Sequence, residues 1–127
     1  MVVKNQQKTI LIIDDDPILV KALQKKLPEN GYAVLTATKA ADGLQAAMDK
    51  YPDLVILDVM MPIINGYNLC QLLKNDPRHR RIPVIILTCR DSEKDKQIGQ
   101  DMGANAYLIK PLDIPLLLVK IKELIKD

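Results

Sequence analysis

The sequence predicts an α/β fold, a doubly wound parallel β-sheet with helices on both faces, and three observations lead to this class. The chain has 127 residues, of which 48% are hydrophobic, a size that fits one compact domain. Short apolar runs alternate with segments of helical periodicity five times. The apolar runs are nearly continuous, which is typical of strands covered on both faces. Right-handed crossovers between parallel strands follow from this alternation.

Five apolar runs are the predicted strands. The run at residues 32–37 is the weakest, but it is β-prone and follows Gly31, a residue type that commonly ends a helix. We therefore expect strands at residues 10–13, 32–37, 54–57, 84–87 and 107–109.

Helical patterns fill the spaces between these runs. The first helix is expected to begin with Pro17 behind an Asp16 N-cap, and leucines then recur every four residues. An apolar stripe at helical spacing marks a C-terminal helix over residues 114–125. The remaining helices are predicted at residues 40–50, 67–74 and 91–102, the last closed by Gly103, more polar, and the most exposed of the five.

Composition excludes several functions and gives the domain limits. The net charge is only +2 and aromatic residues make up 3%, so binding to nucleic acid is not expected. No apolar run reaches the roughly 20 residues of a membrane-spanning helix. Cys70 and Cys89 form neither a metal-binding spacing nor a disulfide framework, which favours a cytoplasmic setting. Residues 1–8 are predicted to be a flexible arm and residues 9–127 the domain.

Polar residues follow four of the five predicted strands. Asp14 and Asp15 follow the first strand, Asp58 the third, Thr88 the fourth and Lys110 the fifth. Active sites of doubly wound sheets lie beyond the carboxyl ends of the strands, so these side chains are expected to converge. Three carboxylates at one spot require a cation, and Mg²⁺ suits a site with few carboxylates and a phosphate. The same groups are those used in phosphoryl transfer.

Four stretches in this order, ILIIDDDP, DLVILDVMMP, PVIILT and YLIKP, resemble the receiver domain of bacterial two-component response regulators over almost the whole chain. The resemblance implies a flavodoxin-like (βα)5 fold with strand order 2-1-3-4-5. It also implies a phosphorelay signalling switch that accepts a phosphoryl group from a sensor histidine kinase or a phosphotransfer protein. Such a domain catalyses its own phosphorylation and slow dephosphorylation, so it is only in part an enzyme.

The resemblance assigns a role to each site residue. Asp58 would be the phosphoacceptor, which is nucleophilic catalysis by a carboxylate. Asp15 and Asp58, with the backbone carbonyl of Met60, would bind Mg²⁺, for which Mn²⁺ could substitute, and Asp14 would act mainly through water. Lys110 would contact the phosphate.

The output side of the resemblance involves two further residues. Thr88 would donate a hydrogen bond to the phosphoryl group, and Tyr107 would follow its movement as the switch that signals through the fourth helix, fifth strand and fifth helix. The implied recipients are a downstream protein or a fused output domain, and a phosphorylation-linked homodimer is a further expectation.

Four positions leave alternatives open. Cys89 is interpreted as a buried, inert thiol rather than a reactive one. Met60 and Arg90 lie where side chains tune the lifetime of the acyl phosphate, and Arg90 could contact the phosphate or point away. For the Lys110–Pro111 bond the resemblance implies cis, whereas general frequencies favour trans.

Individual residues argue against other functions that share parts of this pattern. An aspartate-nucleophile phosphatase would place a second Asp where Met60 stands, and a flavin-binding domain needs a phosphate loop where the chain has three consecutive aspartates. The basic residues 78–81 are interpreted as a solvated loop, and their His79 is the sole histidine, which excludes a zinc site of several histidines. The remaining alternative is an unphosphorylated receiver-fold docking scaffold.

Overall fold

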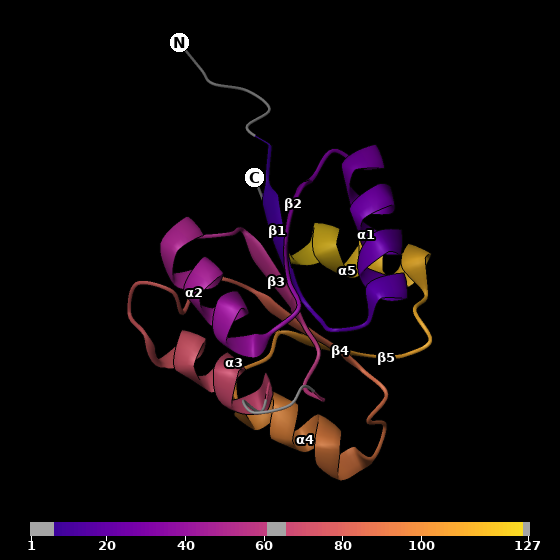
Figure 1. The fold of residues 1–127 in the computed structure, drawn as a ribbon. Coiled ribbons are helices and arrows are strands. Elements are labelled where there is room, and N and C mark those ends of the chain that lie inside the picture. The colour runs from indigo at the N-terminus through magenta and orange to yellow at the C-terminus, as the bar shows by residue number, and fades with distance from the viewer. Residues whose placement is uncertain (1–6, 61–65, 126–127) are drawn as a thin grey trace.

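A single five-stranded parallel sheet with the strand order β2-β1-β3-β4-β5 forms the centre of the molecule (Figure 1). The computed structural model describes residues 7–60 and 66–125, so residues 1–6 of the predicted N-terminal arm lie outside the described residues. The strands are β1 (Thr9–Ile13), β2 (Ala33–Ala37), β3 (Leu54–Leu57), β4 (Val84–Thr88) and β5 (Ala106–Ile109). The predicted fold class and strand order are confirmed.

Four helices connect the strands of the described residues, and a fifth follows β5. They are α1 (Pro17–Glu29), α2 (Ala40–Lys50), α3 (Gly66–Asn75), α4 (Glu93–Asp101) and α5 (Ile114–Leu124). Helices α1 and α5 cover one face of the sheet, and α2, α3 and α4 lie on the other (Figure 1). None of these helices is long and apolar enough to cross a membrane.

Alternating side chains of the central strands supply both cores. In β1, Ile10 and Ile12 pack with the leucines of α1, whereas Leu11 and Ile13 pack against α2 and α3. All four are fully buried, as expected for a central strand with two covered faces. The edge strand β5 has no fully buried residue, and its Tyr107 lies on the α4 side.

Helix ends lie within two residues of the predicted ones, and the start of α4 shifts most. Asp16 caps α1 by accepting hydrogen bonds from the amides of Ile18 and Leu19, and Gly103 takes a positive φ just after α4. Helix α4 begins at Glu93 rather than at 91, because the Ser92 hydroxyl caps it and accepts from an amide of its first turn. As predicted, α4 is the most exposed helix, with a single buried residue.

The prediction of a fully solvated loop at residues 78–81 is wrong for His79. Its side chain is 1% exposed and stacks on Tyr51, with ring centroids 4.6 Å apart. Its two ring nitrogens lie 2.9 Å from Asp76 Oδ2 and 3.1 Å from the Met48 carbonyl oxygen. The imidazole thus joins the loop before β4 to the end of α2, a long-range contact that local charge patterning cannot reveal.

Candidate functional site

The site lies beyond the carboxyl ends of β1, β3, β4 and β5. Backbone pairing continues one residue past two of these strands, since the Asp14 amide donates to the Ala37 carbonyl and the Asp58 amide donates to that of Ile13. The backbone of both aspartates is therefore held by the sheet itself. Their side chains are 1% and 6% exposed, respectively.

Three carboxylates gather at this edge, as the sequence predicts. One oxygen from each of Asp14, Asp15 and Asp58 lies within 4.8 Å of the others. Asp14 and Asp58 are buried, whereas Asp15 is exposed and faces the solvent side of the group. Such a half-open set of oxygen ligands leaves coordination positions for water or phosphate, as Mg²⁺ requires.

Lys110 closes the group from β5. Its Nζ lies 3.0 Å from Asp14 Oδ2 and 3.1 Å from Asp58 Oδ2, so one ammonium bridges two buried carboxylates. Burial acts to lower the pKa of Lys110, but hydrogen bonds and attraction from the two aspartates outweigh it, and the pKa is raised. Lys110 is therefore charged at neutral pH.

The two buried aspartates are oriented by the same local device. Asp14 Oδ1 accepts from the Asp16 amide and Asp58 Oδ1 accepts from the Met60 amide, each at 2.9 Å. Each carboxylate therefore turns its other oxygen toward Lys110. This geometry leaves the side chains little freedom to rotate apart.

The surroundings of the buried Asp14 carboxylate favour a nearby cation. Burial raises its pKa above the ordinary 3.8, although the Asp16 amide and Lys110 both act to lower it. Apart from its ion pair with Lys110, the buried Oδ2 atom has no hydrogen-bonding partner of good geometry among the described residues. A buried, under-satisfied carboxylate oxygen beside two other carboxylates is what a hard divalent ion stabilises.

Thr88 ends β4 next to this group and is completely buried. Its Oγ1 accepts from the Arg90 amide at 3.4 Å, and its carbonyl accepts from the Lys110 amide at 2.8 Å. The Lys110–Pro111 bond is cis, as the resemblance implies.

The Tyr107 side chain lies on the α4 side of the sheet, between α3 and α4. Its hydroxyl donates to the Arg90 carbonyl at 2.9 Å and lies 2.9 Å from the hydroxyl of Tyr67. The Tyr67 hydroxyl also lies 3.2 Å from the Asp95 carbonyl. From sequence, Tyr67 is only the first residue of a predicted helix, because nothing in the local pattern shows which strand its ring contacts.

The structure shows the orientation of Arg90 and the exposure of Met60, for which the sequence leaves alternatives open. The Arg90 guanidinium points to α4, with Nη1 3.5 Å from Asp95 Oδ1, rather than to the carboxylates. Met60 is 50% exposed, and its backbone amide donates to Asp58 Oδ1.

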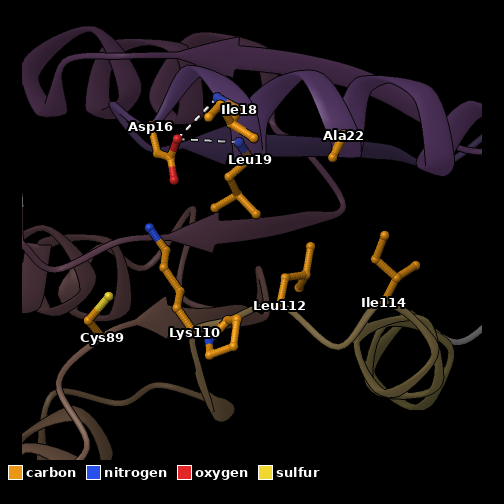
Figure 2. A pocket seen from close by; sticks show the side chains of 9 residues that line it. Asp16, Ile18, Leu19, Ala22, Cys89, Lys110, Leu112 and Ile114 are labelled. Carbon is orange, nitrogen blue, oxygen red and sulfur yellow. Dashed lines mark hydrogen bonds between the residues drawn. The ribbon is translucent and has the colours of Figure 1, made fainter.

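The interpretation of Cys89 as a buried thiol is wrong, because the residue is exposed. It follows the last residue of β4, where the chain leaves the covered part of the sheet. Together with Lys110 and Leu19, Cys89 lines an open pocket of about 530 Å³ between α1 and the loop before α5 (Figure 2).

Comparisons with known proteins agree with this architecture. A family model described as the response regulator receiver domain matches residues 10–122. The transcriptional regulator RpaA of Synechocystis sp. is 39% identical over 117 residues, 92% of this chain and 48% of RpaA. The response regulator PleD of Caulobacter vibrioides is 38% identical over 115 residues, 91% of this chain and 25% of PleD.

A solved structure shows the same fold. The response regulator receiver domain protein of Methanospirillum hungatei superposes with a TM-score of 0.87 at 30% identity, over 93% of each chain. The present chain spans about half the length of RpaA and a quarter of PleD. On the family match, the shared fold and these relatives, the chain belongs to the response regulator receiver domains of two-component systems.

Proposed function

We propose that this domain is a phosphoacceptor switch in which Asp58 accepts a phosphoryl group from the histidine of a sensor kinase or of a phosphotransfer protein. A carboxylate oxygen of Asp58 attacks phosphorus, the N–P bond of the donor breaks, and its electron pair stays on the imidazole nitrogen. The observation that carries the proposal is the joint contact of Lys110 with Asp14 and Asp58, at 3.0 and 3.1 Å.

Lys110 supplies mobile positive charge in this reaction. In the resting state its ammonium neutralises the two buried carboxylates. When the phosphoryl group arrives, the ammonium can turn from Asp58 to a phosphoryl oxygen without leaving Asp14. Positive charge placed where negative charge accumulates is the main source of catalysis in phosphoryl transfer.

Asp14, Asp15, Asp58 and the Met60 carbonyl are the proposed ligands of Mg²⁺, or of Mn²⁺ in its place. The ion would neutralise charge on the transferring phosphoryl oxygens. The buried Asp14 Oδ2, which beyond its ion pair with Lys110 has no hydrogen-bonding partner among the described residues, and the exposed Asp15 support this assignment. The acidic group repels an anionic phosphoryl donor in the absence of a cation, so we expect the reaction to depend on the metal.

The output of the switch is proposed to pass through Thr88 and Tyr107 to the surface formed by α4, β5 and α5. Thr88 moves toward a phosphoryl oxygen to donate its hydroxyl hydrogen, and this movement lengthens its contact with the Arg90 amide. Because the Arg90 carbonyl accepts from Tyr107, the change reaches β5 and α4. The recipients are a downstream protein or a fused output domain, and the greater length of RpaA and PleD supports the second.

Intact mass after incubation with acetyl phosphate, with and without Mg²⁺, tests the proposal. We expect the wild type to gain one phosphoryl group only with the metal, and Asp58→Asn to gain none. Asp16→Asn is the matched control, since asparagine also caps a helix and the position does not contact Lys110. If folded wild-type protein gains nothing, the unphosphorylated docking scaffold becomes the better interpretation.

A further inference from the structure

Tyr67 and Tyr107 form a hydroxyl pair that the proposed switch does not yet include. We propose that Tyr67 is a positioning residue for Tyr107: its hydroxyl donates to the Tyr107 hydroxyl and thereby holds that side chain against the loop between β4 and α4. The inference rests on the proposed function, because it gives the resting position of the residue that carries the signal.

Proton counting gives the direction of the hydrogen bonds. Each phenol has one hydrogen, but the described residues alone give the two hydroxyls three close contacts: with each other at 2.9 Å, from Tyr107 to the Arg90 carbonyl at 2.9 Å, and from Tyr67 to the Asp95 carbonyl at 3.2 Å. Two hydrogens can fill only two of them. The two shorter contacts form one chain, from Tyr67 to Tyr107 to Arg90, so this arrangement is preferred.

Such a chain is stronger than its separate bonds. A hydroxyl that accepts a hydrogen bond becomes a better donor, so the hydrogen bond from Tyr67 strengthens the one from Tyr107 to Arg90. Burial raises the pKa of Tyr107, which keeps its hydroxyl protonated at neutral pH. Tyr67 itself is only 6% exposed and so has little competition from water.

Packing places the ring as closely as the hydrogen bonds place the hydroxyl. A Cβ atom at Gly99 of α4 would lie 2.8 Å from Cδ2 of Tyr107 and 3.2 Å from Cδ1 of Ile86. The ring therefore occupies space that exists only because residue 99 has no side chain. Tyr107 is held at both ends, by glycine at the ring and by Tyr67 at the hydroxyl.

The chain of contacts continues to the phosphorylation site. The amide of Arg90 donates to Thr88 Oγ1, and the carbonyl of the same residue accepts from Tyr107. Movement of Thr88 and release of Tyr107 are thus linked through one loop residue. By reciprocity, a change that loosens Tyr107 must also alter the phosphorylation equilibrium.

The experiment removes one oxygen atom. Protein labelled with ¹³C at tyrosine Cζ gives one NMR signal for each of its four tyrosines, and Tyr107→Phe assigns the signal of interest. In Tyr67→Phe we expect the Tyr107 signal to shift and its relaxation by a soluble gadolinium chelate to increase. The ratio of held to released Tyr107 should fall roughly threefold to tenfold, as expected for one neutral hydrogen bond.

Tyr51→Phe is the matched control, because Tyr51 stacks on His79 and no described contact joins it to Tyr107. Its removal should leave the Tyr107 signal unchanged. Gly99→Ala is a second variant that keeps both hydroxyls and displaces the ring instead. It should move the Tyr107 signal in the same direction as Tyr67→Phe.

A double-mutant cycle separates positioning from simple stability. The rate of phosphorylation by acetyl phosphate is measured in Tyr67→Phe, Tyr107→Phe and the double variant. If Tyr67 acts through Tyr107, its replacement changes the rate in the wild type but not in Tyr107→Phe. Additive effects, or an unchanged Tyr107 signal in unphosphorylated Tyr67→Phe, would overturn the inference while leaving the phosphoacceptor function intact. Wild-type protein that accepts no phosphoryl group would instead remove the function itself.

Discussion

The acidic group at the strand ends and the tyrosine pair beside it are held in opposite ways. Asp14, Asp58 and Lys110 are two buried negative charges and one positive charge, so the group carries an excess of charge that invites a further cation. Tyr67 and Tyr107 are neutral and have more acceptors than hydrogens. Charged contacts in a buried site are strong, whereas neutral hydrogen bonds are each worth about 1 kcal/mol. The difference suits one region to chemistry and the other to switching.

The largest effect is expected from replacing Lys110, whose ammonium bridges the two buried carboxylates. In Lys110→Met the two buried carboxylates lose their ammonium, and no group remains to follow the phosphoryl oxygen. We expect the rate of phosphorylation by acetyl phosphate to fall roughly a hundredfold or more, as for the loss of one charge-stabilising donor. Lys120→Met is the control, because the described ion pair of Lys120 is with Glu123 on α5, away from the acidic group. Equal rates in the two variants would contradict a catalytic role for Lys110.

The second-largest effect is expected from a steric change next to the acidic group that leaves its charges unaltered. Gly66 begins α3, and a Cβ atom there would lie 2.5 Å from Cα of Val59 and 2.6 Å from the carbonyl oxygen of Asp58. Gly66→Ala must therefore displace backbone at Asp58, the proposed phosphoacceptor, at a cost of about 1–3 kcal/mol in the free energy of unfolding. Urea unfolding measures the loss, and unchanged stability together with unchanged phosphorylation would show that α3 moves away without consequence.

Charge removal at Asp14 tests whether the acidic group is strained without a metal. Because its pKa is raised in the folded protein, the folded state holds more protons than the unfolded state between pH 3.8 and the raised value. Stability therefore falls as pH rises through that window. In metal-free buffer at pH 7 we expect Asp14→Asn to melt a few degrees higher than the wild type, with the difference lost below pH 3.8.

Addition of Mg²⁺ should reverse the order of the two melting temperatures, so that the wild type melts higher than Asp14→Asn. Binding to the folded wild type raises its melting temperature, whereas Asp14→Asn has lost a carboxylate of the proposed site and should respond less. Melting curves at several Mg²⁺ concentrations measure this. An equal response of both proteins would exclude Asp14 from the metal site.

The smallest expected effect concerns the lifetime of the phosphorylated state. Met60 is half-exposed and stands two residues after Asp58, where a long side chain can hinder an attacking water. Loss of the phosphoryl group should be a few-fold faster in Met60→Asn. The matched control is Leu72→Asn, which replaces a similarly exposed apolar side chain on α3. Decay at the same rate in wild type and Met60→Asn would refute the shielding role.

The two regions also differ in how far sequence could predict them. Asp14, Asp58, Thr88 and Lys110 each stand directly after a strand, and parallel strands end at one edge, so their meeting follows from the strand assignment. The tyrosines meet across 40 residues of sequence, and no local pattern aligns a residue of α3 with one of β5. Cys89 and His79 were misjudged for the same reason, since their exposure depends on which distant elements cover them.

Sequence alone determined the alternation of strands and helices, the caps at Asp16 and Gly103, and the set of polar groups at the strand ends, because hydrophobic periodicity and turn chemistry act over a few residues. Tertiary structure alone decided that one ammonium bridges two carboxylates, that Arg90 turns to Asp95, and that Gly99 makes room for Tyr107. The Lys110 bridge joins residues far apart in the chain, and all three contacts depend on how loops and helices pack on the complete sheet, which local sequence patterns do not fix.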